Sequence, residues 1–285
     1  MIPAAFDYVR PSTVDEALRA LVDGGEDAKV LAGGQSLIPV MRLRLAAPET
    51  VVDLTRVEGL RGVREEGDEL VVGAMTTHAD VLSDPLLARY GRLLVQATET
   101  VADRQVRRRG TFGGALAHGD PAGDLPAVAL ALDAEFVVVG PAGRRTVAAA
   151  DFFVDYLTTA LEEGELLVEI RLPKLGEGWG VRYEKFNRVA QAWSIVAVAA
   201  AVRREGGRIA EARIGLTNMG PTPLRARATE AALVGVDVSM ETVTAAAAQA
   251  AEGTSPSSDL NAQADYRQHL AQVLTRRAVA AAAGL

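Results

Sequence analysis

The sequence contains no cysteine among its 285 residues and only three histidines. Without cysteine, the chain cannot form a disulfide, provide a thiolate nucleophile or ligate an iron–sulfur cluster of its own. The histidines, His78, His118 and His269, lie far apart, and no His-Glu-x-x-His motif joins two of them. The sequence therefore argues against a zinc hydrolase and indicates no metal site on this chain.

The chain also lacks an excess of positive charge and a long hydrophobic run. Thirty basic against 37 acidic side chains give a net charge of −7, which argues against a nucleic-acid-binding protein. The most apolar run, residues 192–202, is interrupted by Ser194 and is far shorter than the ~20 residues that a membrane span requires. Residues 1–10 have neither the basic leader nor the apolar core of a signal peptide. We therefore expect a soluble, cytoplasmic protein.

Residue patterns in the first half predict a mixture of helices and strands. Thr13 and Glu16 have the spacing of a capping box, at the start of a helix that ends at Gly24. A hairpin is predicted over residues 61–72. Further strands are predicted at 29–32, 51–54, 135–139 and 166–172, and further helices at 77–82, 92–102 and 124–132, the last with Asp124 as its N-cap.

Two glycine-rich segments interrupt these elements. Residues 104–124 are polar and rich in glycine without a clear period, which predicts a long functional loop. Three glycines within 173–180 mark a domain boundary. After it, antiparallel strands are predicted at 181–186, 194–203 and 208–217, followed by alanine-rich helices at 239–252 and 264–283.

A first glycine turn, residues 32–37, follows the predicted strand 29–32. Glycine lets backbone N–H groups converge on an anion, and the start of a helix adds a partial positive charge. The turn is therefore a candidate pyrophosphate cradle, although it equally fits an ordinary strand-to-helix turn with a serine cap. Ser36 is not predicted to be a nucleophile, because its Gly-x-Ser-x-Gly motif lacks the last glycine.

A second glycine turn, residues 110–118, lies about eighty residues further along the chain. Thr111 can donate to a phosphate oxygen, and Asp124 is placed either to accept from a ribose hydroxyl or to cap a helix. Two such turns fit a dinucleotide better than a mononucleotide. Because Gly-x-Gly-x-x-Gly and P-loop motifs are both missing, neither a Rossmann fold nor a P-loop is predicted.

Four other features each have a functional and a structural interpretation. The basic residues 104–109 either offset phosphate charge, face a partner protein or form a solvated surface. His118 either lines a cofactor or is simply hydrogen-bonded in its loop. Lys185 either points toward a polar ligand or lies at the surface, and Trp193 either covers a flat ring or packs in the core.

Taken together, these segments resemble the FAD-binding subunits of molybdenum hydroxylases. Aerobic carbon monoxide dehydrogenase is the nearest branch of this family, and xanthine dehydrogenase is a more distant one. The resemblance covers essentially the whole chain. It is carried by residues 32–37, 73–78, 109–118, 120–126, 220–226 and 265–267.

The resemblance implies a fold and two domains. The fold class is α+β, with a two-lobed FAD-binding domain of the p-cresol methylhydroxylase type over residues 1–175. Its lobes would span about 1–56 and 57–175. A small α+β C-terminal domain would follow over 178–285.

The resemblance also implies FAD as the cofactor and assigns residues to it. The two turns would hold the pyrophosphate, so that valine in place of Gly33 or Gly114 would fill the space of a phosphate and abolish binding. Asp124 would meet sugar hydroxyls, and Trp193 would lie over the isoalloxazine, with Ala192 replacing an acidic residue that is common in the family. The complete set is Ala32, Gly33, Gly34, Gln35, Ser36, Leu37, Ala102, Thr111, Phe112, Gly113, Gly114, Ala115, Ala117, His118, Asp124, Leu161, Lys185 and Trp193.

The function that the resemblance implies is electron transfer. The chain would take electrons from [2Fe–2S] clusters on a small subunit, hold them on FAD and pass them to an external acceptor such as a quinone, NAD or oxygen. Molybdopterin would be on a large subunit, in a dimer of heterotrimers, and the complex would associate peripherally with a quinone-reducing partner. The alternatives are a xanthine or N-heterocycle dehydrogenase subunit, a free-standing flavin reductase, and a non-redox nucleotide-binding module.

Overall fold

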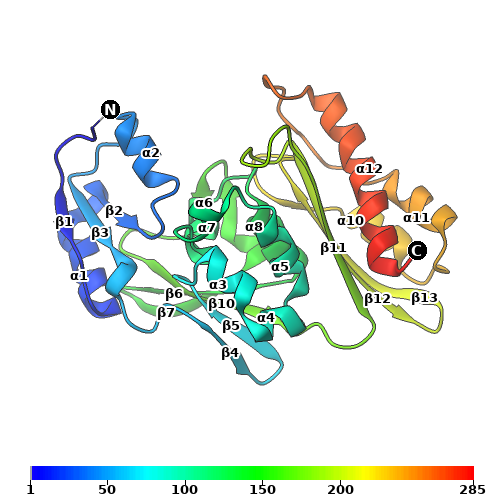
Figure 1. Ribbon diagram of the computed structural model, residues 1–285, viewed down its shortest axis with the longest axis horizontal. Helices are drawn as coiled ribbons and strands as arrows, with labels where there is room; N and C mark the ends of the chain where they lie inside the picture. The colour runs from blue at the N-terminus through cyan, green and yellow to red at the C-terminus, as the bar shows by residue number, and fades with distance from the viewer. Residues whose placement is uncertain (1) are drawn as a thin grey trace.

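The computed structural model describes residues 2–285 and has three parts along its long axis (Figure 1). A three-stranded sheet lies at the N-terminal end, a five-stranded sheet in the middle and a four-stranded sheet at the C-terminal end. Within residues 2–285, the search for a helix both long and apolar enough to cross a bilayer finds none.

The N-terminal lobe is a parallel sheet in the order β1 (Asp7–Val9), β3 (Thr50–Asp53) and β2 (Ala28–Leu31). The predicted capping box is half formed: the Thr13 hydroxyl accepts from the Glu16 N–H, but the Glu16 carboxylate binds Ser12. The other elements of this lobe are α1 (Val14–Gly24), η1 (Gly25–Asp27), α2 (Leu37–Arg42) and η2 (Leu54–Arg56). Ala17, Leu21 and Val52 pack against Val137 and Val168 of the middle sheet, which anchors the lobe.

The middle part is an antiparallel sheet that carries helices on one face. Its strand order is β4 (Val63–Glu66), β5 (Glu69–Gly73), β10 (Leu166–Pro173), β6 (Glu135–Gly140) and β7 (Gly143–Ala148). The helices are α3 (His78–Ser83), α4 (Pro85–Tyr90), α5 (Arg92–Glu99), α6 (Arg104–Arg107), α7 (Phe112–His118), α8 (Asp124–Ala131) and α9 (Ala149–Phe152). The strands β8 (Phe153–Asp155) and β9 (Thr158–Thr159) form a separate small hairpin. The largest hydrophobic core lies between this sheet and its helices.

The C-terminal part is an antiparallel sheet in the order β11 (Trp179–Phe186), β12 (Val196–Glu205), β13 (Arg208–Thr217) and β14 (Leu224–Arg225). The helices α10 (Arg227–Leu233), α11 (Met240–Ala247) and α12 (Ala264–Ala283) complete it. Successive side chains of a strand point to opposite faces, and β12 is buried on both. Ala197, Ala199 and Ala201 belong to the middle core, whereas Val198 and Ala200 between them belong to the core of the C-terminal part.

The contact between the middle and C-terminal parts is close because small residues line it. A Cβ on Gly215 of β13 would overlap the carbonyl oxygen of Ala127 in α8. The Gln96 side chain of α5 bonds the backbone of the edge strand β11, accepting from the Tyr183 N–H and donating to the Val181 carbonyl. The two parts therefore form one packed body, which matters for a site that lies between them.

The predicted elements are largely present, with three corrections. Residues 104–124 are not a structureless loop, because Asp103 and Thr111 cap the two short helices α6 and α7. Asp124 is not an N-cap: Gly123 holds that position and Asp124 is the first helical residue. The helix predicted over 239–252 ends at Ala247.

Candidate functional site

A cavity of about 1020 Å³ lies between the N-terminal lobe and the middle part and extends to β11. Of the 18 residues that the sequence assigns to a cofactor, all but Phe112 line it. The side chain of Phe112 is fully buried in the core and does not line the cavity, so its predicted contact with the cofactor has no support from the cavity lining. The fold therefore brings both glycine turns, Asp124, Lys185 and Trp193 to one place.

The first glycine turn presents unused backbone donors to this cavity. Among residues 2–285, no acceptor receives a hydrogen bond from the N–H groups of Gly33, Gly34, Gln35 and Ser36. Gly34 has φ +73°, a conformation that glycine adopts without strain and that lets successive N–H groups converge. Ser36 occupies the N-cap position of α2, but its hydroxyl makes no capping bond. Four N–H groups and one hydroxyl therefore remain available to an anion.

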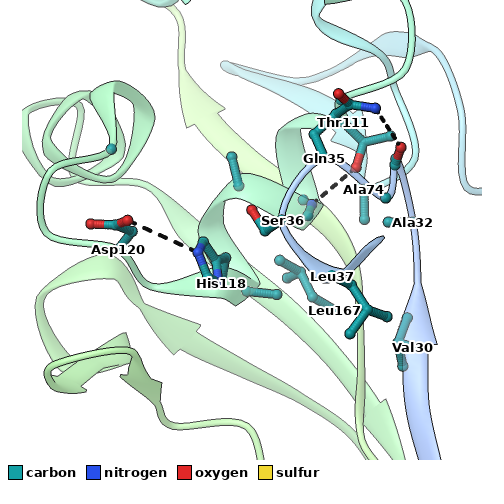
Figure 2. Close-up of a pocket in the computed structure, with 18 of the residues that line it drawn as sticks. Val30, Ala32, Gln35, Ser36, Leu37, Ala74, Thr111, His118, Asp120 and Leu167 are labelled. Carbon is teal, nitrogen blue, oxygen red and sulfur yellow. Dashed lines mark hydrogen bonds and ion pairs between the residues drawn. The ribbon is translucent and has the colours of Figure 1, made fainter. Parts of the chain in front are cut away.

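The second glycine turn uses its donors internally. The N–H groups of Phe112 and Gly113 each donate at 2.9 Å to carbonyl oxygens of Thr76 and Ala74. The Gly114 N–H donates to Thr111 Oγ1 at 3.1 Å, as in an N-cap (Figure 2). The second turn is thus part of the wall, fastened to the chain that follows β5.

The two turns touch each other through Gly33. A Cβ at this position would overlap the Arg109 carbonyl oxygen and lie 2.6 Å from the Gly110 Cα. The sequence reasoning attributed this glycine to the approach of a phosphate, but the space is filled by the backbone of the other turn. Gly33 therefore holds the N-terminal lobe against the middle part.

His78 lies behind the second turn. Its backbone N–H donates to the Gly110 carbonyl, and its buried Nδ1 has no hydrogen-bond partner within residues 2–285. Burial lowers the pKa of His78 to about 4, and the nearby Arg107 charge acts in the same direction. The imidazole is therefore neutral at pH 7. In the sequence, His78 is the last residue of the segment 73–78, and no local pattern there indicates its role.

Asp124 is the centre of a buried polar network between the middle and C-terminal parts. Its Oδ1 accepts from the Tyr183 hydroxyl at 2.6 Å and from the Ser194 hydroxyl at 2.7 Å. Its Oδ2 accepts from Lys185 Nζ at 2.8 Å, and both charged side chains are about 5% exposed. Lys185 also donates to the Thr100 carbonyl at 3.1 Å. The surface interpretation of Lys185 is wrong, and neither Tyr183 nor Ser194 was expected here.

The predicted residues His118 and Trp193 also line the cavity. Trp193 is 56% exposed, so it does not pack in the core. The half-buried His118 is directed toward Asp120, with 4.0 Å between Nε2 and Oδ2 (Figure 2). Gln191, which was not predicted, donates to Asp103 at 2.5 Å and ties the loop before Trp193 to the start of α6.

The arginines of residues 104–109 differ in exposure, and one of them bonds the backbone of the cavity wall. Arg104, Arg108 and Arg109 are exposed, whereas Arg107 is half-buried. Arg107 donates to the carbonyls of Val101 at 2.6 Å and Ala102 at 3.1 Å. Ala102 has φ +41°, so the guanidinium stabilises a strained stretch of the cavity wall.

This fold and cavity are those of a flavoprotein subunit of the molybdenum hydroxylases. Residues 4–175 match the family described as "FAD binding domain in molybdopterin dehydrogenase", and residues 181–282 match the "CO dehydrogenase flavoprotein C-terminal domain". The chain belongs to this family.

Within the family, the chain is similar to carbon monoxide dehydrogenase medium chains. It is 45% identical to the one from Hydrogenophaga pseudoflava, over 99% of this chain and 98% of that one. It is 43% identical to the one from Afipia carboxidovorans, over 98% and 97% respectively. A solved structure of carbon monoxide dehydrogenase from Hydrogenophaga pseudoflava matches 99% of this chain and 98% of that chain with a TM-score of 0.97 and 47% identity.

These findings confirm the resemblance that the motifs indicated. They confirm the α+β flavoprotein fold, the assignment to an oxidoreductase and the role as the FAD subunit of a multi-subunit molybdenum-dependent dehydrogenase.

Proposed function

We propose that this chain is the FAD-carrying medium chain of an aerobic carbon monoxide dehydrogenase. It takes electrons from [2Fe–2S] clusters of a small subunit and passes them to an external acceptor. The observation that carries the proposal is the row of unused N–H donors in the first turn, which faces a cavity of about 1020 Å³. The full-length similarity to carbon monoxide dehydrogenase medium chains supports the choice of enzyme.

The residues present fit an FAD molecule. A pyrophosphate needs several hydrogen-bond donors, and residues 33–36 offer four N–H groups together with the Ser36 hydroxyl. Sugar hydroxyls need a polar group inside the cavity, which the Asp124–Lys185 pair provides. A flat aromatic ring needs an apolar wall, and Trp193, Leu161 and Ala102 are cavity residues of that kind.

When bound, FAD supplies the redox chemistry, and the protein contributes binding and orientation. The first turn holds the negative charge of the phosphates in place. Trp193 and the two residues before it line the cavity, and the bond from Gln191 to Asp103 fixes this loop beside the cofactor site. Because the chain contains no cysteine, the clusters that reduce the flavin must belong to another polypeptide.

The partners follow from this division of labour. A small iron–sulfur subunit and a large subunit with the molybdopterin cofactor complete the enzyme, as a dimer of heterotrimers in the cytoplasm. The exposed arginines 104, 108 and 109, beside the cavity, are the part of the surface that we assign to partner contact. A quinone-reducing partner at the membrane is the proposed destination of the electrons.

The test is to produce the full chain alone and together with its small and large subunits. The chain alone is expected to bind FAD but not to reduce it on addition of carbon monoxide. The assembled complex is expected to reduce the flavin with carbon monoxide and not with a purine or a quinoline. Absorbance at the flavin bands, together with iron and molybdenum content, measures both properties.

The outcomes separate the parts of the proposal. A folded chain that cannot be loaded with FAD would refute the cofactor assignment. Reduction of the flavin in the isolated chain by carbon monoxide would refute the subunit role. Reduction in the complex by an N-heterocycle or a purine instead of carbon monoxide would keep the role and replace the substrate.

A further inference from the structure

The hydrogen bonds of Asp124 leave one defined acceptor position free. A carboxylate has about four lone-pair sites, two on each oxygen. Oδ1 already accepts from two hydroxyls, those of Tyr183 and Ser194. Oδ2 accepts only from Lys185, so one site remains on Oδ2. Asp124 lines the cavity, which makes this site available to a molecule bound there.

Lys185 is left with a complementary donor. An ammonium group has three N–H bonds, and two of those on Lys185 go to Asp124 and to the Thr100 carbonyl. The side chain also lines the cavity. One acceptor on Asp124 and one donor on Lys185 therefore lie next to each other. This pair matches a hydroxyl group, which both donates and accepts.

The two hydroxyls that fill Oδ1 belong to residues of the C-terminal part whose backbone is fixed by other hydrogen bonds, some of them to the middle part. Tyr183 and Lys185 are two residues apart on β11 and therefore share one face of the strand. The Tyr183 N–H is fixed by Gln96 at 3.0 Å. The Ser194 carbonyl accepts from Asn218 Nδ2 at 2.8 Å, and the Asn218 N–H donates to Pro121 at 2.7 Å. Neither hydroxyl depends on a ligand for its position.

We propose that Tyr183 and Ser194 are positioning residues for the cofactor: by filling Oδ1 of Asp124 they direct Oδ2 and Lys185 toward one sugar hydroxyl of FAD. The inference rests on the proposed function, since it assumes that FAD occupies the cavity. It adds that the C-terminal part completes the FAD site through groups that need not touch the cofactor. Burial, followed by the Asp124 charge, raises the pKa of Tyr183 well above 10, so this hydroxyl remains a donor throughout the physiological range.

The experiment compares FAD affinity in full-length variants from which the flavin has been removed. Tyr183→Phe and Ser194→Ala each free one site on Oδ1, so that the carboxylate can rotate. Each is expected to weaken FAD binding about tenfold, as measured by quenching of flavin fluorescence. Tyr8→Phe is the matched control, because Tyr8 makes the same kind of bond to Asp53 and neither residue lines the cavity in the described part of the chain. It is expected to leave FAD affinity unchanged.

Two further variants distinguish positioning from simple structural support. Ser194→Thr keeps the hydroxyl and is expected to restore most of the affinity that Ser194→Ala loses. In an Asp124→Asn background, Tyr183→Phe is expected to weaken binding less than about twofold further, because the acceptor that it orients has been replaced. Thermal unfolding without FAD is measured for all variants.

The outcomes are distinct. If wild-type protein does not bind FAD, the proposed function itself fails. If wild-type protein binds FAD and both Tyr183→Phe and Ser194→Ala bind as tightly as Tyr8→Phe, the positioning role is refuted while the proposed function stands. If Tyr183→Phe does not fold, the Ser194→Ala and Ser194→Thr pair decides the question.

Discussion

The two glycine turns look alike in sequence but differ in how their backbone N–H groups are used in the structure. In the first, residues 33–36 keep four backbone N–H groups free. In the second, the N–H groups of residues 112–114 are bonded to Thr76, Ala74 and Thr111. The comparison teaches that a glycine-rich turn binds an anion only if its donors are unused, and that glycine content alone does not reveal this. In the proposed function, the first turn is therefore the anion cradle, and the second is the wall next to it.

The largest effect is expected where the two turns touch. Gly33→Val would place side-chain atoms where the Arg109 carbonyl and the Gly110 Cα lie, so the turns must separate. We expect a loss of stability of about 3 kcal/mol or more and a purified chain without FAD. Urea unfolding and flavin content measure the two effects.

Gly176→Val is the control for this substitution. A Cβ at Gly176 meets nothing within 4 Å, and the residue does not have a positive φ. Its stability is expected to change by no more than about 0.5 kcal/mol, with normal FAD content. A Gly33→Val chain with the stability and flavin content of this control would show that the turns do not depend on each other.

Acid should lower the stability of the fold through the region around the second turn, because the buried His78 packs behind that turn. With a folded-state pKa of about 4 and an ordinary unfolded-state pKa of about 6.5, the unfolded chain binds more protons between these values. Stability therefore falls as the pH is lowered through this window, and this residue alone accounts for about 3 kcal/mol between pH 7 and pH 4. The contribution levels off about one pH unit below the folded-state pKa, where both states are protonated.

His78→Gln measures this contribution, since glutamine does not titrate. The unfolding free energy of wild type minus that of the variant should fall by about 3 kcal/mol as the pH is lowered from 7 to 4. The exposed His269 serves as the control for replacing a histidine with glutamine, and His269→Gln is measured over the same pH range. A pH-independent difference between wild type and His78→Gln would mean that the pKa of His78 is the same in the folded and the unfolded chain, and would refute the effect of burial.

Much of the fold was predictable because local signals agreed with the tertiary structure. The capping residue Thr77 marks the start of α3, and the strand over 208–217 and the helix over 264–283 have the predicted bounds. The helices α6 and α7 were missed because glycine and arginine give little helical pattern there. Burial of Phe112 and Leu116 and capping by Asp103 and Thr111 stabilise them instead. Strand β7 was missed because only one of its residues is buried.

The site was predictable as a set of residues but not as a set of roles. Of the residues predicted from the motifs, 17 line one cavity. The network around Asp124, in contrast, depends on side chains that are distant from it in sequence. Tyr183 and Ser194 lie 59 and 70 residues from Asp124, and no spacing rule connects them. The distinction between the turns was hidden for the same reason, since it is residues 74–76 that occupy the donors of the second turn.

The smallest effect gives the sharpest comparison, because Thr111 and Ser36 occupy the same N-cap position of their helices. The Thr111 hydroxyl accepts from the Gly114 N–H, so Thr111→Val should cost about 1 kcal/mol of stability. The Ser36 hydroxyl makes no capping bond, so Ser36→Ala should change stability by less than about 0.5 kcal/mol. Thermal unfolding of the FAD-free chain measures both changes.

For FAD affinity the order of the two variants should be the reverse of their order for stability. If the first turn is the anion cradle, the free Ser36 hydroxyl contributes to the bound state, and Ser36→Ala should weaken FAD about three- to tenfold. The Thr111 hydroxyl is already engaged in the wall, and its loss leaves the four free N–H groups of residues 33–36 in place, so Thr111→Val should weaken FAD less than Ser36→Ala does. Equal losses of affinity in the two variants would mean that both turns hold the phosphates. A larger loss of FAD affinity in Thr111→Val than in Ser36→Ala would mean that the second turn, and not the first, holds the phosphates. Because the two substitutions remove one hydroxyl each from equivalent positions, such a difference reports on the donors around them and not on helix capping itself.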